Sequence, residues 1–254
     1  MTLKILALET SGLYGSAALA EDGQLIAEAT LEPPSRSAQG LAPLLDRLLR
    51  NAGWNPRDVG LVAVVDGPGS FTGLRVGLTT AKLFAYASGA SVLGVNTFAA
   101  IACAAPTTTP PTTTTENCRL VMVADAQRGQ LLTARWRRNA AGDCQEESPP
   151  SLLDVDRWLS SLSAEDVVAG PALAMGRPRL ADSLPAGVRT LPESHWMPTA
   201  ATVARLAWHD FQAGRRDSLW SLVPRYHRPS AAEEVKGAQA TASATVTVDP
   251  PPRP

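Results

Sequence analysis

The strongest constraint on the fold of this chain is a pattern that occurs twice. Near the amino terminus, "ILALETSGLYGSAAL" indicates an apolar strand ending at Glu9, a turn with Gly15 and a second strand. Later, "LVMVADAQRGQLLTAR" has the same order, with Asp125 at the end of the strand and Gly129 in the turn. Glycine supplies the backbone conformations that tight turns need. Such internal similarity indicates a duplicated fold with two lobes.

The first hundred residues predict the order β-β-β-α-β-α. Three antiparallel strands come first, and Asp22-Gly23 supplies the turn between the second and the third. A helix with leucines at helical spacing follows, then an uninterrupted apolar strand of the kind that helices cover on both faces, then a second helix. In chain order these elements cover residues 3–10, 14–20, 24–31, 37–53, 60–67 and 77–88.

The second half begins after an abrupt change in composition. "PTTTPPTTTT" has too little apolar surface to fold, so we expect a flexible loop there, and a disordered tail from residue 231. Between them we predict a strand pair over 119–138, a strand over 166–170, and helices over 154–162 and 202–213. Four tryptophans are predicted to lie in the core or between the lobes: Trp158, Trp196, Trp208 and Trp220. The expected divisions are an N-terminal lobe over 1–105, the loop over 106–117, a smaller C-terminal lobe over 118–230 and the tail over 231–254.

The stretch "GPGSFTGLR", Gly67 to Arg75, connects a predicted strand to a predicted helix, where phosphate-binding loops occur. It lacks the Gly-Lys-Ser/Thr of a Walker loop, and its glycine spacing does not match the dinucleotide fingerprint. Pro68 replaces the first glycine of a nucleophile elbow, which argues against a catalytic Ser70. Ser70 or Thr72 can instead cap the helix that comes next.

A stripe of small residues runs from this turn along one face of the second helix. Because glycine costs about 1 kcal/mol of helix propensity, such a stripe needs a packing reason. Two interpretations are open: a helix of another subunit approaches this face, or the face packs against the chain's own sheet. The stripe falls at every fourth position: Gly69, Gly73, Gly77, Ala81 and Ala85.

Composition excludes several classes of protein. A net charge of −1 over 254 residues argues against a chain that binds nucleic acid by itself. No signal-peptide pattern and no apolar stretch of membrane-spanning length is present, so we expect a cytoplasmic protein without a membrane partner. The cysteines predict free thiols and the histidines no metal site, because their spacing fits neither a CxxC pair nor an H-x-x-x-H motif: Cys103, Cys118, Cys144, His195, His209 and His227.

Four segments resemble the TsaB (YeaZ) family of bacterial proteins of tRNA threonylcarbamoyladenosine biosynthesis: "ILALETS", "GPGSFTGLRVG", "DAQRGQ" and "PRYHR", within residues 3–229. The resemblance implies an α/β, actin-like and Hsp70-like (ribonuclease H-like) fold of two lobes, with mixed central sheets and a reduced second lobe. It also implies a non-catalytic scaffold. In this family the catalytic partner, TsaD, transfers a threonylcarbamoyl group to the adenosine 3′ of the anticodon in tRNAs that read codons starting with A. An ATPase, TsaE, joins the complex, and tRNA is expected to meet this chain only indirectly.

The resemblance also implies where partners bind. In this family two helices of the amino-terminal lobe contact TsaD, or a second copy of the chain when TsaD is absent. The implied interface consists of the small-residue stripe and leucines of the preceding helix: Gly69, Gly73, Gly77, Ala81, Ala85, Leu41, Leu45 and Leu48. Ser37 and Gln130 depart from the histidine and glutamate that are usual in the family, and the Pro/Thr-rich loop is unusual. Polar contacts at the first two positions therefore stay open.

Actin-like ATPases use an acidic residue at the end of each lobe's first strand to hold magnesium and position water. Glu9, followed by Thr10 and Ser11, and Asp125 occupy these places and form a possible vestigial nucleotide cleft. A second glycine-rich motif for adenosine is missing, and a carboxylate at a strand end also caps turns. We therefore expect no metal and no cofactor on this chain alone, with ATP or ADP left open at a subunit junction. The alternative is a stand-alone ATPase or small-molecule kinase of the actin-like fold.

Overall fold

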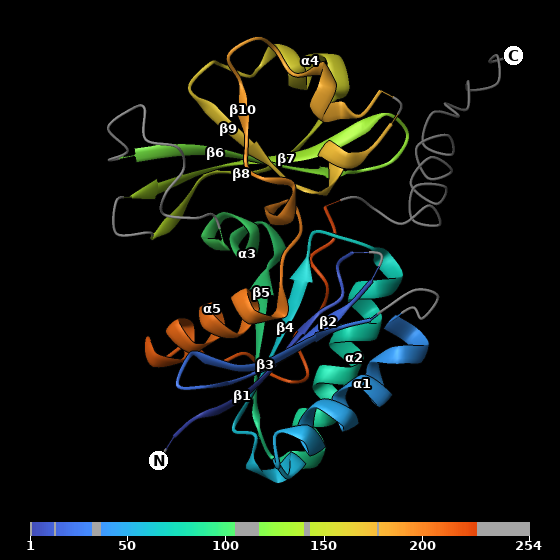
Figure 1. Cartoon of the computed structure of the whole chain (residues 1–254), viewed down its shortest axis with the longest axis vertical. Coiled ribbons are helices and arrows are strands. Elements are labelled where there is room, and N and C mark those ends of the chain that lie inside the picture. The colour runs from blue at the N-terminus through green and yellow to red at the C-terminus, as the bar shows by residue number, and fades with distance from the viewer. Residues whose placement is uncertain are drawn as a thin grey trace, which may run out of the picture.

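The computed structural model describes residues 2–12, 14–31, 37–104, 117–139, 143–176 and 178–227. Two five-stranded mixed sheets lie one above the other in Figure 1, with the strand orders β3-β2-β1-β4-β5 and β8-β7-β6-β9-β10. In each sheet the first three strands in sequence pair antiparallel, and the next two run parallel to the first. The two sheets therefore share one topology, and the predicted two-lobed α/β fold is confirmed.

Lobe 1, the lower part of Figure 1, is built on the first sheet. Four of its strands, β1, β2, β4 and β5, alternate their side chains between two helical layers and are therefore mostly apolar, whereas the edge strand β3 is largely exposed. Leu6 and Leu8 face the core beneath α1 and α2, whereas Ile5 and Ala7 face α5 on the other side. The elements are β1 (Lys4–Glu9), β2 (Ser16–Glu21), β3 (Gln24–Thr30), α1 (Ser37–Asn51), a 3₁₀ turn (Pro56–Asp58), β4 (Leu61–Gly67), α2 (Phe71–Ser88), β5 (Ser91–Asn96) and α5 (Ala200–Gln212).

Lobe 2 is smaller, as predicted. Its core surrounds the fully buried Trp158, whose Nε1 donates a hydrogen bond to Thr133 Oγ1 over 3.2 Å. Helix α3 (Thr97–Ala104) continues from β5 and lies between the lobes, where Phe98 and Ile101 pack into the lobe 2 core. The elements of lobe 2 are β6 (Asn117–Asp125), β7 (Gln130–Asn139), β8 (Cys144–Asp154), α4 (Val155–Ser160), β9 (Asp166–Ala169), β10 (Arg189–Thr190) and 3₁₀ turns at Pro171–Ala174, Leu180–Ser183 and Glu193–His195.

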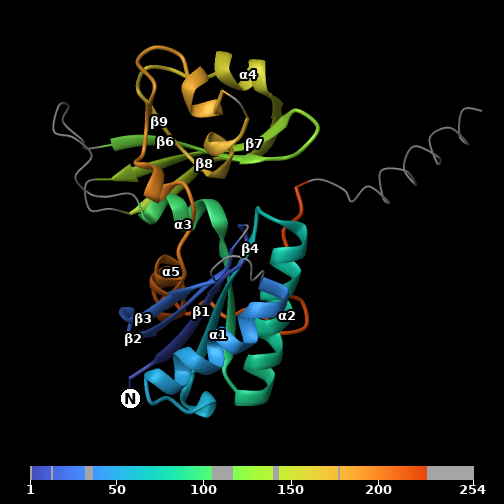
Figure 2. The ribbon, with the colours of Figure 1, turned by 45° about the vertical axis from the view of Figure 1, so that its right-hand side comes forward.

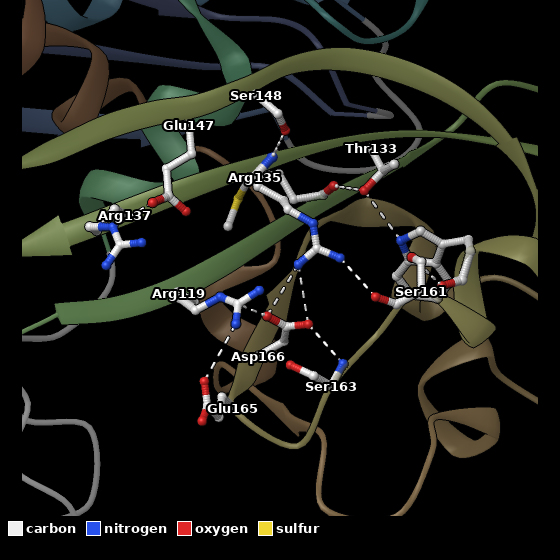
Figure 3. Close-up of polar contacts among 12 residues, drawn as sticks. Arg119, Thr133, Arg135, Arg137, Glu147, Ser148, Ser161, Ser163, Glu165 and Asp166 are labelled. Atoms are coloured by element: carbon white, nitrogen blue, oxygen red, sulfur yellow. Dashed lines mark hydrogen bonds and ion pairs between the residues drawn. The ribbon is translucent and has the colours of Figure 1, made fainter.

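A buried aspartate holds lobe 2 together on one side of its sheet. The side chain of Asp166 is inaccessible to solvent, and Arg135 Nη1 lies 3.2 Å from both of its carboxylate oxygens. Asp166 Oδ2 also accepts a hydrogen bond from the backbone of Ser163, while Arg135 donates to the carbonyl of Ser161 (Figure 3). These contacts attach the segment between α4 and β9 to β7.

The predicted division into lobes is wrong for the carboxyl-terminal part of the chain, which the sequence pattern assigns to the second lobe. Helix α5 comes after lobe 2 in sequence, yet Ala200, Val203 and Ala207 are buried in the core of lobe 1. Beyond it, Asp217 accepts a hydrogen bond from Gly94 of β5, and the carbonyl of Leu222 accepts one from Lys82 of α2. Residues 200–227 thus complete lobe 1 instead of belonging to lobe 2.

Three predictions fall outside the described residues: the loop at 106–116, the tail from 231, and any contact made by the side chain of Ser37. Across the residues that the structure does describe, the helices are all too short or too polar to traverse a bilayer.

Candidate functional site

A cavity of about 780 Å³ lies between the two lobes. Lobe 1 contributes the turn that contains Ser70, and lobe 2 contributes the turn that contains Asp125. The last described residues of the chain, 225–227, complete its wall. This is the cleft in which the family resemblance predicts a vestigial nucleotide site.

Two of the resembling motifs meet at this cleft, although they lie far apart in the sequence. Arg225 Nε donates to Asp66 Oδ2 over 2.9 Å, and Arg75 Nε donates to the hydroxyl of Tyr226 over 2.8 Å. The Arg75 guanidinium also lies 3.8 Å from the ring centre of Phe71, which packs against Tyr226. The turn "GPGSFTGLR" therefore anchors the "PRYHR" segment to lobe 1.

The ion pair of Asp66 is electrostatically asymmetric. Burial raises the pKa of the Asp66 carboxyl, whereas Arg225 and, less strongly, Arg215 lower it. The aspartate is buried, but half of the Arg225 side chain is exposed. Because a buried carboxylate needs a partner more than a half-exposed guanidinium does, Arg225 serves mainly to stabilise Asp66.

Ser70 has a structural role at the start of α2. Its Oγ accepts a hydrogen bond from the backbone of Gly73 over 3.2 Å, which satisfies one of the free N–H groups at a helix start. Of the two predicted caps, Ser70 rather than Thr72 is the one that the structure uses.

The two carboxylates of the predicted nucleotide cleft do not share a cavity. Glu9 is 3% exposed and lines a second cavity, of about 420 Å³, together with Glu28 and Met197. Its Oε1 accepts hydrogen bonds from the backbone and the hydroxyl of Ser11, at 2.6 and 2.5 Å. Burial nevertheless raises the pKa of Glu9 to about 7. Of this pair, Asp125 alone lines the cleft between the lobes.

Asp125 and the other residues predicted around it have structural roles. Asp125 is exposed, and its Oδ1 accepts a hydrogen bond from the backbone of Gln127 over 2.6 Å, so it caps its own turn. Ser11 also lines the cleft, but Thr10 is fully buried against α2. Gln130, one of the two departures from the family, contacts Asp154 at the end of β8. A magnesium–nucleotide site would need both carboxylates at one cavity, so these residues do not fit it.

The small-residue stripe packs against this chain's own sheet, which is the second of the two interpretations. A Cβ atom added to Gly73 would overlap the carbonyl oxygen of Thr10, and one added to Gly77 would overlap the Thr10 hydroxyl. A Cβ on Gly69 would likewise overlap Ser11. The remaining residues of the expected interface are buried inside lobe 1: Ala81, Ala85, Leu41, Leu45 and Leu48. The prediction that these side chains contact a partner is therefore corrected, except at Gly69, which is exposed and for which contact with a partner stays a prediction.

The opposite face of α2 is exposed and carries two large apolar side chains near its carboxyl end. Leu83 is 64% exposed and Tyr86 is 70% exposed, and Trp220 lies beside Tyr86 with 80% of its surface accessible. The prediction of a buried Trp220 is wrong, whereas Trp158 and Trp196 are core residues as expected. The sequence does carry a signal for this surface, since Leu83 and Tyr86 lie on the side of the helix away from the glycines, where polar residues are usual. We call Leu83, Tyr86 and Trp220 the α2 outer face.

Comparison with known proteins identifies the family to which this chain belongs. The family model described as "TsaD: tRNA N6-adenosine threonylcarbamoyltransferase" matches residues 34–178, more than half of the chain. The chain belongs to this family. Its longer matches are to TsaB proteins: that of Escherichia coli is 29% identical over 171 residues, which cover 66% of this chain and 71% of that protein. That of Bacillus subtilis is 26% identical over 174 residues, covering 68% and 71%.

Solved structures agree with the fold. The structure of YeaZ from Pseudomonas aeruginosa is 23% identical, with a TM-score of 0.72, and the match covers 88% of this chain and 99% of that one. The resemblance to TsaB (YeaZ) proteins is thereby confirmed, and with it the two-lobed fold.

Proposed function

We propose that this chain is a non-catalytic assembly subunit of tRNA threonylcarbamoyladenosine biosynthesis, which binds and stabilises the catalytic subunit TsaD. The names of the E. coli and B. subtilis relatives, both "tRNA threonylcarbamoyladenosine biosynthesis protein TsaB", support the pathway. The exposed apolar α2 outer face supports a role in assembly, because large apolar and aromatic side chains gathered on a surface mark sites of protein association.

The proposed interface uses the outward faces of α1 and α2 instead of their buried faces. Tyr86 and Trp220 offer the kind of aromatic side chains that anchor protein interfaces, and Leu83 adds aliphatic surface one helical turn away. The two helices pack side by side, so a partner helix laid along α2 also meets the polar outer side of α1 (Figure 2). In the absence of TsaD, we expect a second copy of the chain to occupy the same face.

We further propose that the chain does no chemistry alone. The observation that supports this is the separation of Glu9 and Asp125 into different cavities, which leaves the cleft between the lobes with one carboxylate of the expected pair. TsaE and tRNA then act on the complex through TsaD, and any ATP or ADP is held at a subunit junction.

The test is reconstitution with TsaD, TsaE, threonylcarbamoyl-adenylate and a substrate tRNA, with modified adenosine measured by mass spectrometry of nucleosides. We expect product to require this chain, and Leu83→Glu to lower the rate at least tenfold by placing a charge in the interface. The matched control is Leu25→Glu, which puts the same charge on an exposed leucine of β3. Equal rates with and without the chain would refute the proposal, and phosphate release from ATP by the chain alone would favour the alternative of a stand-alone ATPase.

A further inference from the structure

Two cysteines that lie far apart in the sequence meet between the lobes. Cys103 is in α3, and Cys144 is the first residue of β8, the edge strand of the lobe 2 sheet. Their thiols are hydrogen-bonded to each other, and both residues are half-buried. In Figure 1, α3 lies directly against the lobe 2 sheet, which explains how the two side chains reach one another. The third cysteine is Cys118 in β6. Burial raises the pKa of its thiol, and the two arginines Arg189 and Arg138 lower it.

The surroundings make the two thiols unequal. The hydrogen bond from Cys144 lowers the pKa of Cys103, and the positive charges of Arg205 and Arg138 act in the same direction, against burial and Asp143. The same hydrogen bond, together with burial, raises the pKa of Cys144. Arg205 also donates to the carbonyl oxygen of Cys103 over 2.6 Å, which holds the guanidinium beside this end of α3. Because the thiolate is the reactive form, the lowered pKa makes Cys103 the more reactive of the two thiols.

We propose that Cys103 and Cys144 are a site of reversible oxidation, at which a small-molecule disulfide converts the two thiols into a disulfide that ties α3 to β8. The geometry that carries this proposal is the direct contact of the two thiols across two elements, α3 and β8, that pack against each other. A partly accessible pair with one activated thiol is the arrangement that thiol–disulfide exchange requires.

With oxidised glutathione as the oxidant, the reaction has two steps. The Cys103 thiolate attacks one glutathione sulfur, the glutathione disulfide bond breaks, and one glutathione thiolate leaves. The mixed disulfide no longer carries the negative charge that held the proton on Cys144, so Cys144 loses its proton and attacks Cys103 Sγ. The mixed disulfide breaks and releases the second glutathione. Two protein thiols are oxidised, and one glutathione disulfide is reduced to two thiols.

The bond would connect elements on either side of the junction between the lobes. Helix α3 continues from β5 of lobe 1, whereas β8 belongs to lobe 2. A disulfide between them restricts the unfolded chain and resists separation of α3 from the lobe 2 sheet. We expect the midpoint of thermal unfolding to rise by about 5 °C on oxidation and to return when dithiothreitol is added.

The experiment uses the full chain treated with oxidised glutathione, digested with trypsin and examined without reduction. One complication is that trypsin leaves Cys103 and Cys118 on the same peptide, 83–119, while Cys144 lies on 139–157. The Cys118→Ser variant removes this ambiguity, so it is the matched control. We expect 83–119 joined to 139–157 in that variant, and free thiols to fall from two to none, while the wild type falls from three to one.

Two further variants test the order of the steps. Cys144→Ser should accumulate glutathione on Cys103, because the second thiol is missing, whereas Cys103→Ser should leave Cys144 largely unmodified. The cross-linked protein should migrate as a monomer on a non-reducing gel. Cross-linked dimers, a disulfide that contains Cys118, or glutathione adducts without any link between the two peptides would each overturn the proposal. Fragmentation of the linked wild-type peptides between Cys103 and Cys118 assigns the bond without any variant, so poor folding of a mutant cannot conceal the answer.

Discussion

Lobes 1 and 2 have the same strand order, but they differ in the elements that come after the fourth strand. In lobe 1, β4 leads into α2, a helix of 18 residues, whereas in lobe 2 the equivalent strand, β9, leads into 3₁₀ turns and the two-residue β10. Lobe 1 also gains α5 and the segment up to residue 227 from the end of the chain. Lobe 1 thus carries long helices with exposed outer faces, whereas lobe 2 contributes short elements and one wall of the cleft.

The carboxylates at the ends of the first strands show the same divergence. Glu9 of lobe 1 is buried and accepts hydrogen bonds from Ser11, whereas Asp125 of lobe 2 is exposed and caps a turn. Equivalent positions in a shared topology have therefore acquired different roles, and neither role resembles that of a magnesium ligand. Fold likeness predicts the position of such residues better than it predicts their function.

The largest effect is expected from the buried aspartate of lobe 2. Arg135→Leu removes the closest cation from the inaccessible Asp166 carboxylate and leaves it with Arg119 Nε at 3.5 Å and the backbone N–H of Ser163, so we expect a loss of about 3 kcal/mol in the free energy of unfolding. The control is Arg137→Leu, on the same strand, which removes an ion pair to Glu147 and should cost about 0.5 kcal/mol. Urea denaturation measures both, and equal losses would show that Asp166 does not depend on Arg135.

The next effect concerns Glu9 and pH. Its pKa is raised from 4.5 to about 7 in the folded chain, so between these values the folded state holds a proton that the unfolded state has lost. Stability therefore falls as pH rises from 4.5 to 7, by about 3 kcal/mol from this group, and the penalty persists above pH 7. Glu9→Gln should lose this part of the pH dependence in urea titrations. The lobe 2 counterpart Asp125→Asn should cost about 1 kcal/mol at pH 7, through its weakened hydrogen bond to Gln127.

A similar slope in wild type and Glu9→Gln would show that Glu9 has the same pKa in the folded and the unfolded chain. The two first-strand carboxylates would then be more alike than their burial indicates.

A smaller loss should result from Gly73→Ala. The added methyl group overlaps the backbone carbonyl of Thr10, and we expect overpacking to lower stability by about 2 kcal/mol, although alanine is the better helix former. Thr79→Ala, at an exposed position of α2, is the matched control and should be neutral or slightly stabilising. Chemical denaturation measures both changes. If Gly73→Ala is more stable than wild type, the stripe does not pack against Thr10, and a partner helix could contact it.

The smallest loss of stability is expected at Asp66, the buried aspartate of lobe 1, which can be compared with Asp166 of lobe 2. Arg225→Leu removes the close partner of Asp66, but Arg215 still acts on Asp66 and half of Arg225 is already exposed. We therefore expect a loss of about 1 kcal/mol, below that of Arg135→Leu, with Arg216→Leu as an exposed control in the same segment. A loss as large as that of Arg135→Leu would mean that both lobes depend equally on their buried aspartates.

Local patterns in the sequence predicted much of this fold. The strand–turn–strand over 119–138 formed as expected, because its apolar run and its turn glycine are both local signals. Ser70 caps α2 for the same reason. By contrast, β8 was not predicted, because its sequence "CQEESPPSLLD" has few apolar residues and two prolines, which strands tolerate mainly at a sheet edge. Strands β5 and β10 and helix α3 were missed as well.

Long-range packing accounts for the other differences. Nothing near Ala200 indicates that α5 returns to lobe 1, and nothing near Cys103 indicates that Cys144 lies beside it. The glycine stripe showed that α2 has a close neighbour, but spacing alone could not distinguish a partner helix from the end of β1. The position of Thr10 against Gly73 and Gly77 decides between them.

The central claim is that this chain assembles with a partner through the α2 outer face. Light scattering of the purified chain, alone and mixed with TsaD from the same organism, tests it most directly when wild type, Leu83→Glu and Leu25→Glu are compared. We predict a wild-type homodimer that is replaced by a one-to-one complex with TsaD, no association by Leu83→Glu, and wild-type behaviour by Leu25→Glu. A Leu83→Glu variant that still binds TsaD, or a wild type that stays monomeric with and without TsaD, would contradict the account.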